Sequence, residues 1–249
     1  MPDYFENPTY VVVNYKIMEL KLKKNVLLAY TDIAAAGSRA LFGIGMKMEH
    51  IKLDIPEVSN LRAASVRPTA PQPMEQDFHP LQILNCMYEE FTVVVINTVL
   101  PGEKVHYVVN TIMDLCVKSN VEHIYLMAAV HLGSLESQIH PLYENPFFTK
   151  PVTSHPALPD DTPIQDPFFN TFIQMLLVEQ IPTTCFLVPG HKASIGPAND
   201  EDGSKNSIVL LQDVLHELTR LRFNNVLSNS LLYQEKNEDN VDMVSMIYS

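Results

Sequence analysis

Continuous apolar runs alternate along the chain with stretches of helical periodicity. Runs long enough for buried strands lie at 25–30, 91–98, 123–130 and 183–188. Apolar positions at helical spacing lie at 33–42, 104–119, 168–180 and 208–223. Strands that are apolar throughout are typical of a parallel sheet covered on both faces. The pattern therefore predicts an α/β fold, a three-layer sandwich with a mostly parallel central sheet and helices on both faces.

Capping and breaking residues place the ends of these helices. Thr31 or Asp32 is expected to cap the first helix, with glycines ending it at 43 and 45. Asp166-Pro167 is expected to begin the third, and Ser207 to cap the last. The sequence thus offers a start signal for most of the predicted helices.

The remaining segments are less regular. A strand is predicted at 50–53, and 81–88 is expected to form a hairpin with 91–98 around Glu89-Glu90. The run 11–15 is expected to form an edge strand or hairpin. The Pro-rich segments 56–80 and 133–167 are expected to be long loops. Together these elements predict one domain over 1–230, followed by a flexible acidic tail over 231–249.

Charge and cysteine content narrow the classes of protein. The net charge is −12, which disfavours nucleic acid and anionic membrane surfaces as partners. No apolar run is long enough to span a membrane. The three cysteines, at 86, 116 and 185, form neither a disulfide framework nor a zinc pattern, and Cys116 and Cys185 fall on core-like positions. We expect an intracellular protein, cytoplasmic and nuclear, with no cofactor.

Motifs for catalysis are absent from the sequence. The turn after 25–30 reads TDIAAAGSR, with one glycine where dinucleotide binding needs three. The serine elbow Gly-x-Ser-x-Gly does not occur, and Ser38 falls inside a predicted helix. If Asp32, His131 and His191 met in a pocket at the strand ends, an enzyme would be favoured.

A loop rich in histidine invites a metal hypothesis. It carries His131, His140 and His155, with acids at Glu136, Glu144, Asp160 and Asp161. No pair of these histidines has the close spacing of a zinc site. Surface histidines are the simpler interpretation, and we expect no metal.

The end of the chain carries the most specific pattern. From Glu235 onward the sequence is polar and acidic, yet it ends in Ile247, Tyr248 and Ser249. A hydrophobic residue, then Tyr, then a residue with a free carboxylate can dock: the ring fills a slot and the carboxylate pairs with a lysine. Folding of Ile247 and Tyr248 back onto the body is the alternative.

Several segments, in order, resemble the proteasome assembly chaperone 1 family. They are 25–30 with the small-residue helix 34–41, 91–97, 104–119, 123–130, Asn145-Pro146-Phe147-Phe148, the helix 172–180 followed by Ile181-Pro182-Thr183, and the ending Ile247-Tyr248-Ser249. The likeness covers roughly 25–249. The segment 56–80 does not match, and the longer charged N-terminal extension of some members is missing.

This resemblance implies a chaperone without catalytic activity. It implies a heterodimer with proteasome assembly chaperone 2 that supports assembly of the 20S proteasome α-ring. Ile247, Tyr248 and the carboxylate of Ser249 would then dock between α subunits. The alternatives are an enzyme of nucleoside phosphorylase or hydrolase type on the same fold, and an activator or regulatory subunit of the mature proteasome.

Overall fold

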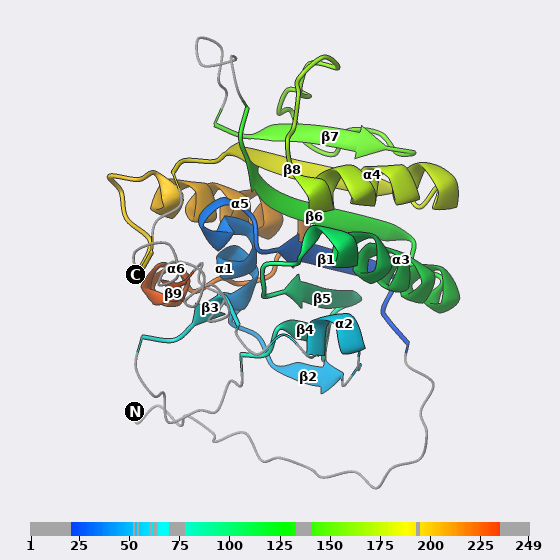
Figure 1. Cartoon of the computed structure of the whole chain (residues 1–249), viewed down its shortest axis with the longest axis horizontal. Helices are drawn as coiled ribbons and strands as arrows, with labels where there is room; N and C mark the ends of the chain where they lie inside the picture. The colour runs from blue at the N-terminus through cyan, green and yellow to red at the C-terminus, as the bar shows by residue number, and fades with distance from the viewer. Residues whose placement is uncertain are drawn as a thin grey trace, which may run out of the picture.

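A seven-stranded sheet forms the centre of the molecule, with strand order β2-β4-β5-β1-β6-β8-β7 (Figure 1). The structure is a computed structural model that describes residues 21–51, 53, 55–59, 61, 64–69, 78–132, 141–192 and 195–234. The strands are β1 (Asn25–Tyr30), β2 (Met48–Ile51), β4 (Leu81–Cys86), β5 (Phe91–Ile96), β6 (His123–Val130), β7 (Tyr143–Phe147) and β8 (Thr183–Pro189).

The middle of the sheet is parallel and its edges are antiparallel. Strands β5, β1, β6 and β8 pair in parallel, and β4, β2 and β7 add antiparallel strands at the two sides. The predicted hairpin is confirmed, since Leu81 pairs with Ile96 and Glu89-Glu90 are exposed between the strands. The predicted mostly parallel sheet is therefore correct.

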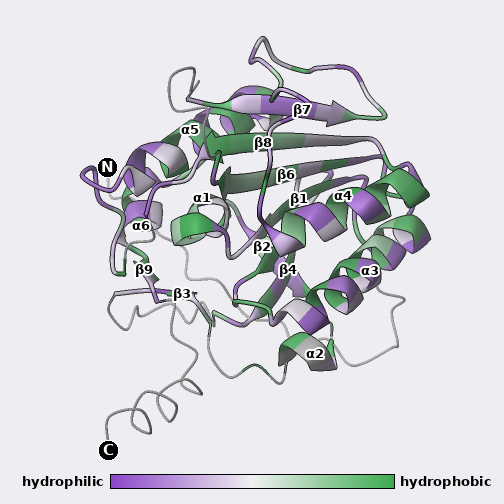
Figure 2. Ribbon diagram, turned by 45° about the horizontal axis from the view of Figure 1, so that its top comes forward, coloured by the Kyte–Doolittle hydropathy of each residue, from purple (hydrophilic) through white to green (hydrophobic). Residues whose placement is uncertain are grey.

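Helices cover both faces of the sheet (Figures 1 and 2). One face carries α1 (Ala36–Phe42), α5 (Ser204–Thr219) and α6 (Asn225–Ser230); the other carries α2 (Pro56–Ser59), α3 (Gly102–Ser119) and α4 (Pro167–Glu179). Side chains of β1 alternate between two cores: Val26 and Leu28 pack under α3 and α4, Leu27 and Ala29 under α1 and α5. This arrangement confirms the predicted three-layer sandwich.

The predicted core positions of two cysteines are also confirmed. Cys116 lies on the buried side of α3 and Cys185 in β8, and both are free thiols. They pack in the same core, between the sheet and the layer of α3 and α4. They serve as small apolar side chains there.

The two segments predicted to be long loops contain regular structure. Within 133–167 lies β7, which pairs with β8 and was missed because it contains Pro146 and Glu144. An edge strand tolerates proline because one side of it needs no partner. Within 56–80 lie α2 and the short β3 (Val66–Arg67), which pairs with β9 (Leu232–Tyr233).

Several predicted boundaries are wrong. The last long helix, α5, begins at Ser204 after Gly203 in a left-handed conformation, so Ser207 lies inside the helix and does not cap it. Strand β2 covers 48–51 rather than 50–53. Asp166 caps α4 as predicted, its carboxylate accepting a hydrogen bond from the N–H of Phe169 at 2.8 Å.

The first helix differs from its prediction as well. Residues Ile33–Ala35 form a separate 3-10 turn before α1, because Ala34 and Ala35 both have left-handed backbone angles (φ 56° and 51°). The predicted strand at 11–15 lies outside the described residues. Among the helices that are described, none is both long and apolar enough to cross a bilayer.

Candidate functional site

The carboxyl ends of β1 and β6 form the switch point of the sheet, where open α/β folds bind ligands. Asp32 follows β1 there and is buried. One oxygen of its carboxyl accepts hydrogen bonds from the backbone N–H of Ala129 at 2.6 Å and of Gly37 at 3.1 Å. The side chain thus bridges β6 and α1 at this end of the sheet.

Helix α1 packs closely against β6 at Gly37, beside this carboxyl. A Cβ atom on Gly37 would lie 2.4 Å from the carbonyl oxygen of Met127, in the backbone of β6. Ser38, the serine of this small-residue segment, is also buried, and its hydroxyl donates to the carbonyl of Tyr30 at 2.8 Å. The small residues of 34–38 therefore serve packing.

Burial controls the protonation of this region. It raises the pKa of Asp32 to about 8, against the opposing effect of its backbone N–H donors. Nearby, the Tyr30 hydroxyl donates to a carboxylate oxygen of Asp166 at 2.8 Å. Burial and the negative charge of Asp166 raise the pKa of Tyr30 well above its usual range. Tyr30 therefore stays protonated and ties β1 to the start of α4.

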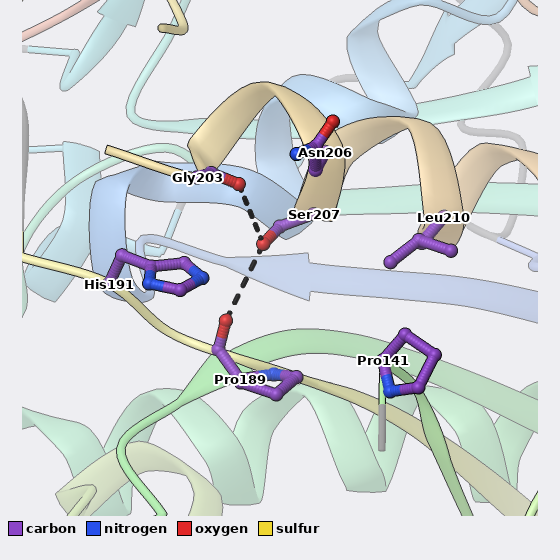
Figure 3. A pocket seen from close by; sticks show the side chains of 7 residues that line it. All are labelled: Pro141, Pro189, His191, Gly203, Asn206, Ser207 and Leu210. Atoms are coloured by element: carbon purple, nitrogen blue, oxygen red, sulfur yellow. Dashed lines mark hydrogen bonds between the residues drawn. The ribbon is translucent and has the colours of Figure 1, made fainter. Parts of the chain in front are cut away.

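A shallow cavity of about 300 Å³ lies beyond the end of β8 (Figure 3). It is lined by Pro141, Pro189, His191, Gly203, Asn206, Ser207 and Leu210. The Ser207 hydroxyl lies 3.2 Å from the carbonyl oxygen of Gly203 and 3.5 Å from that of Pro189, and the figure shows no bond from it to His191. Asp32 and His131 are not among the lining residues, so the cavity does not gather the three groups that would favour an enzyme.

The structure does not bring together those acids and histidines of the metal hypothesis that it describes, whereas Glu136 lies outside the described residues. Glu144 is buried, and its carboxylate accepts hydrogen bonds from the N–H of Val152 at 2.5 Å and of Thr153 at 2.8 Å. His155 is exposed, whereas His140 lies outside the described residues. Within the part of the chain that the structure describes, no group of three metal-ligating side chains is close enough to hold an ion.

Arg39 forms a cluster that sequence reasoning missed. This side chain of α1 is fully buried, and one guanidinium nitrogen donates to the carbonyl of Leu231 at 3.0 Å and also to that of Gly196. The guanidinium carbon lies 5.6 Å from the centre of the Tyr233 ring. Burial lowers the pKa of Arg39 to about 10, which still leaves it charged at neutral pH.

Backbone pairing completes this cluster at residues 231–234. Strand β9 pairs with β3, and the N–H of Gln234 donates to the carbonyl of Ser65 at 2.9 Å. Leu231 and Tyr233 are buried, although the sequence had placed the start of the tail at 231. We call residues 231–234 the tail root. The predicted docking residues Ile247, Tyr248 and Ser249 lie outside the described residues.

Comparison with known proteins gives similarity in structure only. No protein-family model matches the chain, and no curated protein matches it. Among solved structures, a protein of unknown function from Thermoplasma acidophilum is similar at TM-score 0.63 and 16% identity, over 89% of this chain and 90% of that one.

Two further structures come from Pyrococcus furiosus. PbaA, described as an archaeal homolog of proteasome-assembly chaperone, has TM-score 0.57 and 11% identity over 92% of this chain and 86% of its own. PbaB, described as an archaeal proteasome activator, has TM-score 0.56 and 7% identity over 93% and 96%. The chain therefore shares the α/β fold of these proteins.

Proposed function

We propose that the chain is a chaperone for assembly of the 20S proteasome α-ring. The observation that carries the proposal is the tail root. On a fold shared with PbaA, the root is held to α1 by Arg39 and to β3 by backbone pairing, next to fifteen further residues that end in Ile247-Tyr248-Ser249. Fifteen residues reach about 50 Å when extended. A docking motif at the end of a tether of this length can reach a binding site at a distance from the body of the protein.

In this proposal the tail enters a pocket between two α subunits. The Tyr248 ring fills a slot, Ile247 packs beside it, and the carboxylate of Ser249 pairs with a lysine. One short peptide binds weakly, so a second contact from the body is needed. The body acts as a heterodimer with proteasome assembly chaperone 2, in the cytoplasm and the nucleus.

The side chains at the carboxyl ends of the parallel strands favour a role without catalysis. The carboxyl of Asp32 at the switch point accepts hydrogen bonds from two backbone N–H groups, and α1 packs closely against β6 beside it at Gly37. His191, in contrast, lines the shallow cavity. An enzyme of the nucleoside phosphorylase or hydrolase type would need such groups to converge on a substrate.

The test is binding of the full chain to purified 20S α subunits. Tyr248→Ala and deletion of 247–249 should each weaken binding by tenfold or more, by about 1.4 kcal/mol in binding free energy. Tyr88→Ala is the matched control, because Tyr88 is 76% exposed on the body. Equal binding by wild type and the Tyr248 variant would refute tail docking.

An activator of the mature proteasome is a second candidate, since PbaB shares the fold at TM-score 0.56. Native electrophoresis of cell extract distinguishes the two roles. A chaperone comigrates with half-assembled particles, whereas an activator comigrates with complete 20S particles that hydrolyse peptide faster.

A further inference from the structure

The two edges of the seven-stranded sheet are covered differently. Strand β7 forms one edge and β2 the other (Figure 1). The loop after β7 covers the outer side of that strand, since the N–H of Glu144 donates to the carbonyl of Pro156 at 2.9 Å. The side-chain oxygen of Asn145 also accepts a hydrogen bond from the N–H of Leu158 at 3.0 Å. In contrast, no strand that the structure describes pairs with the outer side of β2. Proteins usually cover such an edge, because an open one can pair with other chains.

The register of β2 shows which of its backbone groups point outward. Strand β2 is antiparallel to β4, with Met48 opposite Cys86. In the same register, the carbonyl of Lys47 accepts a hydrogen bond from the N–H of Met87 at 3.2 Å. In an antiparallel ladder, alternate residues direct their backbone groups to the same neighbouring strand. Lys47 and Glu49 therefore face β4, and the backbone N–H and C=O of Met48 point outward, where a further strand would pair.

The side chains of β2 lie at the margins of both cores. Met48 packs against the core beneath α1 and α5, and Ile51 against the core beneath α3 and α4. A strand added beside β2 would contact both cores, one with each of its faces. A run that is apolar at successive positions suits this place. The run 11–15 reads VVVNY, and its three valines are residues that favour strands.

The start of the described chain lies near this edge of the sheet. Leu22 is buried, and its N–H donates to the hydroxyl of Ser119 at 3.0 Å. The ammonium of Lys23 donates to the carbonyl of Cys86 at 2.6 Å. Because Cys86 pairs with Met48, this ammonium lies one strand away from the amino end of β2.

The residues between the run and Leu22 are long enough to join the two places. A strand on the outer side of β2 would lie two strand spacings from β4, about 10 Å. Residues 16–22 reach about 23 Å when extended. Strand β2 points in the same direction as β1, since β2 and β5 are both antiparallel to β4, and β5 is parallel to β1. The shortest path therefore brings the end of the run to the amino end of β2, so that the run lies antiparallel to β2.

We propose that residues 11–15 form a further strand on the outer side of β2 of the same chain, antiparallel to it. The strand satisfies the outward backbone groups of Met48 and extends both cores by one strand. It also closes this edge to strand addition by other proteins. The pairing requires neither tail docking nor binding to proteasome subunits.

Amide exchange of the full chain, resolved to single residues by NMR, tests the pairing. In wild type the outward N–H of Met48 should exchange slowly. Of two neighbouring residues in a strand, one directs its N–H to the partner strand, and proline has no N–H to donate. At least one of Val12→Pro and Val13→Pro should therefore speed exchange at Met48 by tenfold or more. Glu6→Pro, outside the run, is the matched control and should leave Met48 unchanged. Amides of β6 should stay slow in every variant, which shows that the fold is intact.

A disulfide scan identifies the occupant of the edge. Glu49→Cys is combined in turn with a cysteine substitution at each position of 11–15. Residues directly opposite in antiparallel strands have Cβ atoms about 5 Å apart. Oxidation should therefore cross-link the two cysteines within one chain. The yield should alternate along the run, because neighbouring residues of a strand point to opposite faces. The three native cysteines are buried, and Glu49→Cys alone serves as the control.

Each contrary outcome would overturn the proposal. Fast exchange at Met48 in wild type would show that the edge is open. Slow exchange that neither proline variant changes would mean that another part of the chain covers it. Cross-linked dimers on non-reducing electrophoresis would assign the edge to a second copy of the chain. An even yield along 11–15 would exclude a strand there. If a proline variant fails to fold, the cysteine variants still decide, because their backbones remain able to pair.

Discussion

Asp32 should make the stability of the protein fall as the pH rises. Its carboxyl has an ordinary pKa of 3.8 in the unfolded chain and one of about 8 in the folded protein. Between these values the folded state holds a proton that the unfolded state has released. Asp32's stabilising contribution is therefore fully present below the lower value and is lost as the pH rises through the upper one.

The slope follows from the size of the shift. With one proton bound on folding, the free energy of unfolding falls by about 1.4 kcal/mol per pH unit, or about 3 kcal/mol between about pH 5 and pH 7. Other carboxyls of the protein titrate too, so the informative quantity is the difference between wild type and Asp32→Asn. Asparagine has the same shape and cannot ionise. Any constant cost of its amide does not change the slope.

Urea unfolding followed by circular dichroism provides the measurement. Stability in water is extrapolated at several pH values and constant ionic strength, and the two proteins must share one m-value. The advantage of wild type over Asp32→Asn should shrink steadily from about pH 5 to pH 7. A difference that stays constant over this range would show that the carboxyl is ionised in the folded protein and would refute the reasoning.

Three further predictions test the packing. Gly43→Ala should destabilise the protein by about 1–3 kcal/mol in the same urea assay, because its Cβ would lie 1.9 Å from the Ser228 hydroxyl. Gly45→Ala should change stability little, since its nearest neighbour is 3.7 Å away, and equal effects would contradict the packing argument. Arg39→Met should speed amide exchange at 231–234 by tenfold or more, because the carbonyl of Leu231 loses its donor, whereas Arg67→Ala, which removes an exposed bond to Gln234, should not. Finally, burial raises the pKa of Cys116 to about 12 and that of Cys185 also rises, so both thiols should resist alkylation in the native protein and react after unfolding in urea; rapid native labelling of either would show that the core opens.

The parts of the fold that sequence reasoning predicted well are those with a local signal. After their first residues, Asn25 and His123, strands β1 and β6 are apolar because both faces of each are largely buried, and α3 carries a clear helical period. Asp166 caps α4 through a hydrogen bond to a residue only three positions later in the sequence. In each case the residues that form the element also carry the pattern.

The parts that were missed depend on distant partners. Strand β7 is held by β8, whose first residue pairs with Phe147 from thirty-six positions away, and its own composition resembles a loop. Arg39 acts through carbonyls 157 and 192 positions along the chain, so a single arginine in a small-residue helix gave no sign of its role. The left-handed Ala34 and Ala35 have no sequence signal either, since glycine or asparagine is usual there.

The position of β1 in the sheet also bears on how the protein is made. This strand, the first of those that the structure describes, lies between β5 and β6, so Asn25 pairs with Phe91 and with His123, 66 and 98 residues later. During synthesis both edges of β1 stay unpaired until the ribosome has produced β5 and β6. Contacts of such long range slow folding and leave an apolar strand open to aggregation. We therefore expect the nascent chain to need early binding by general chaperones such as holdases.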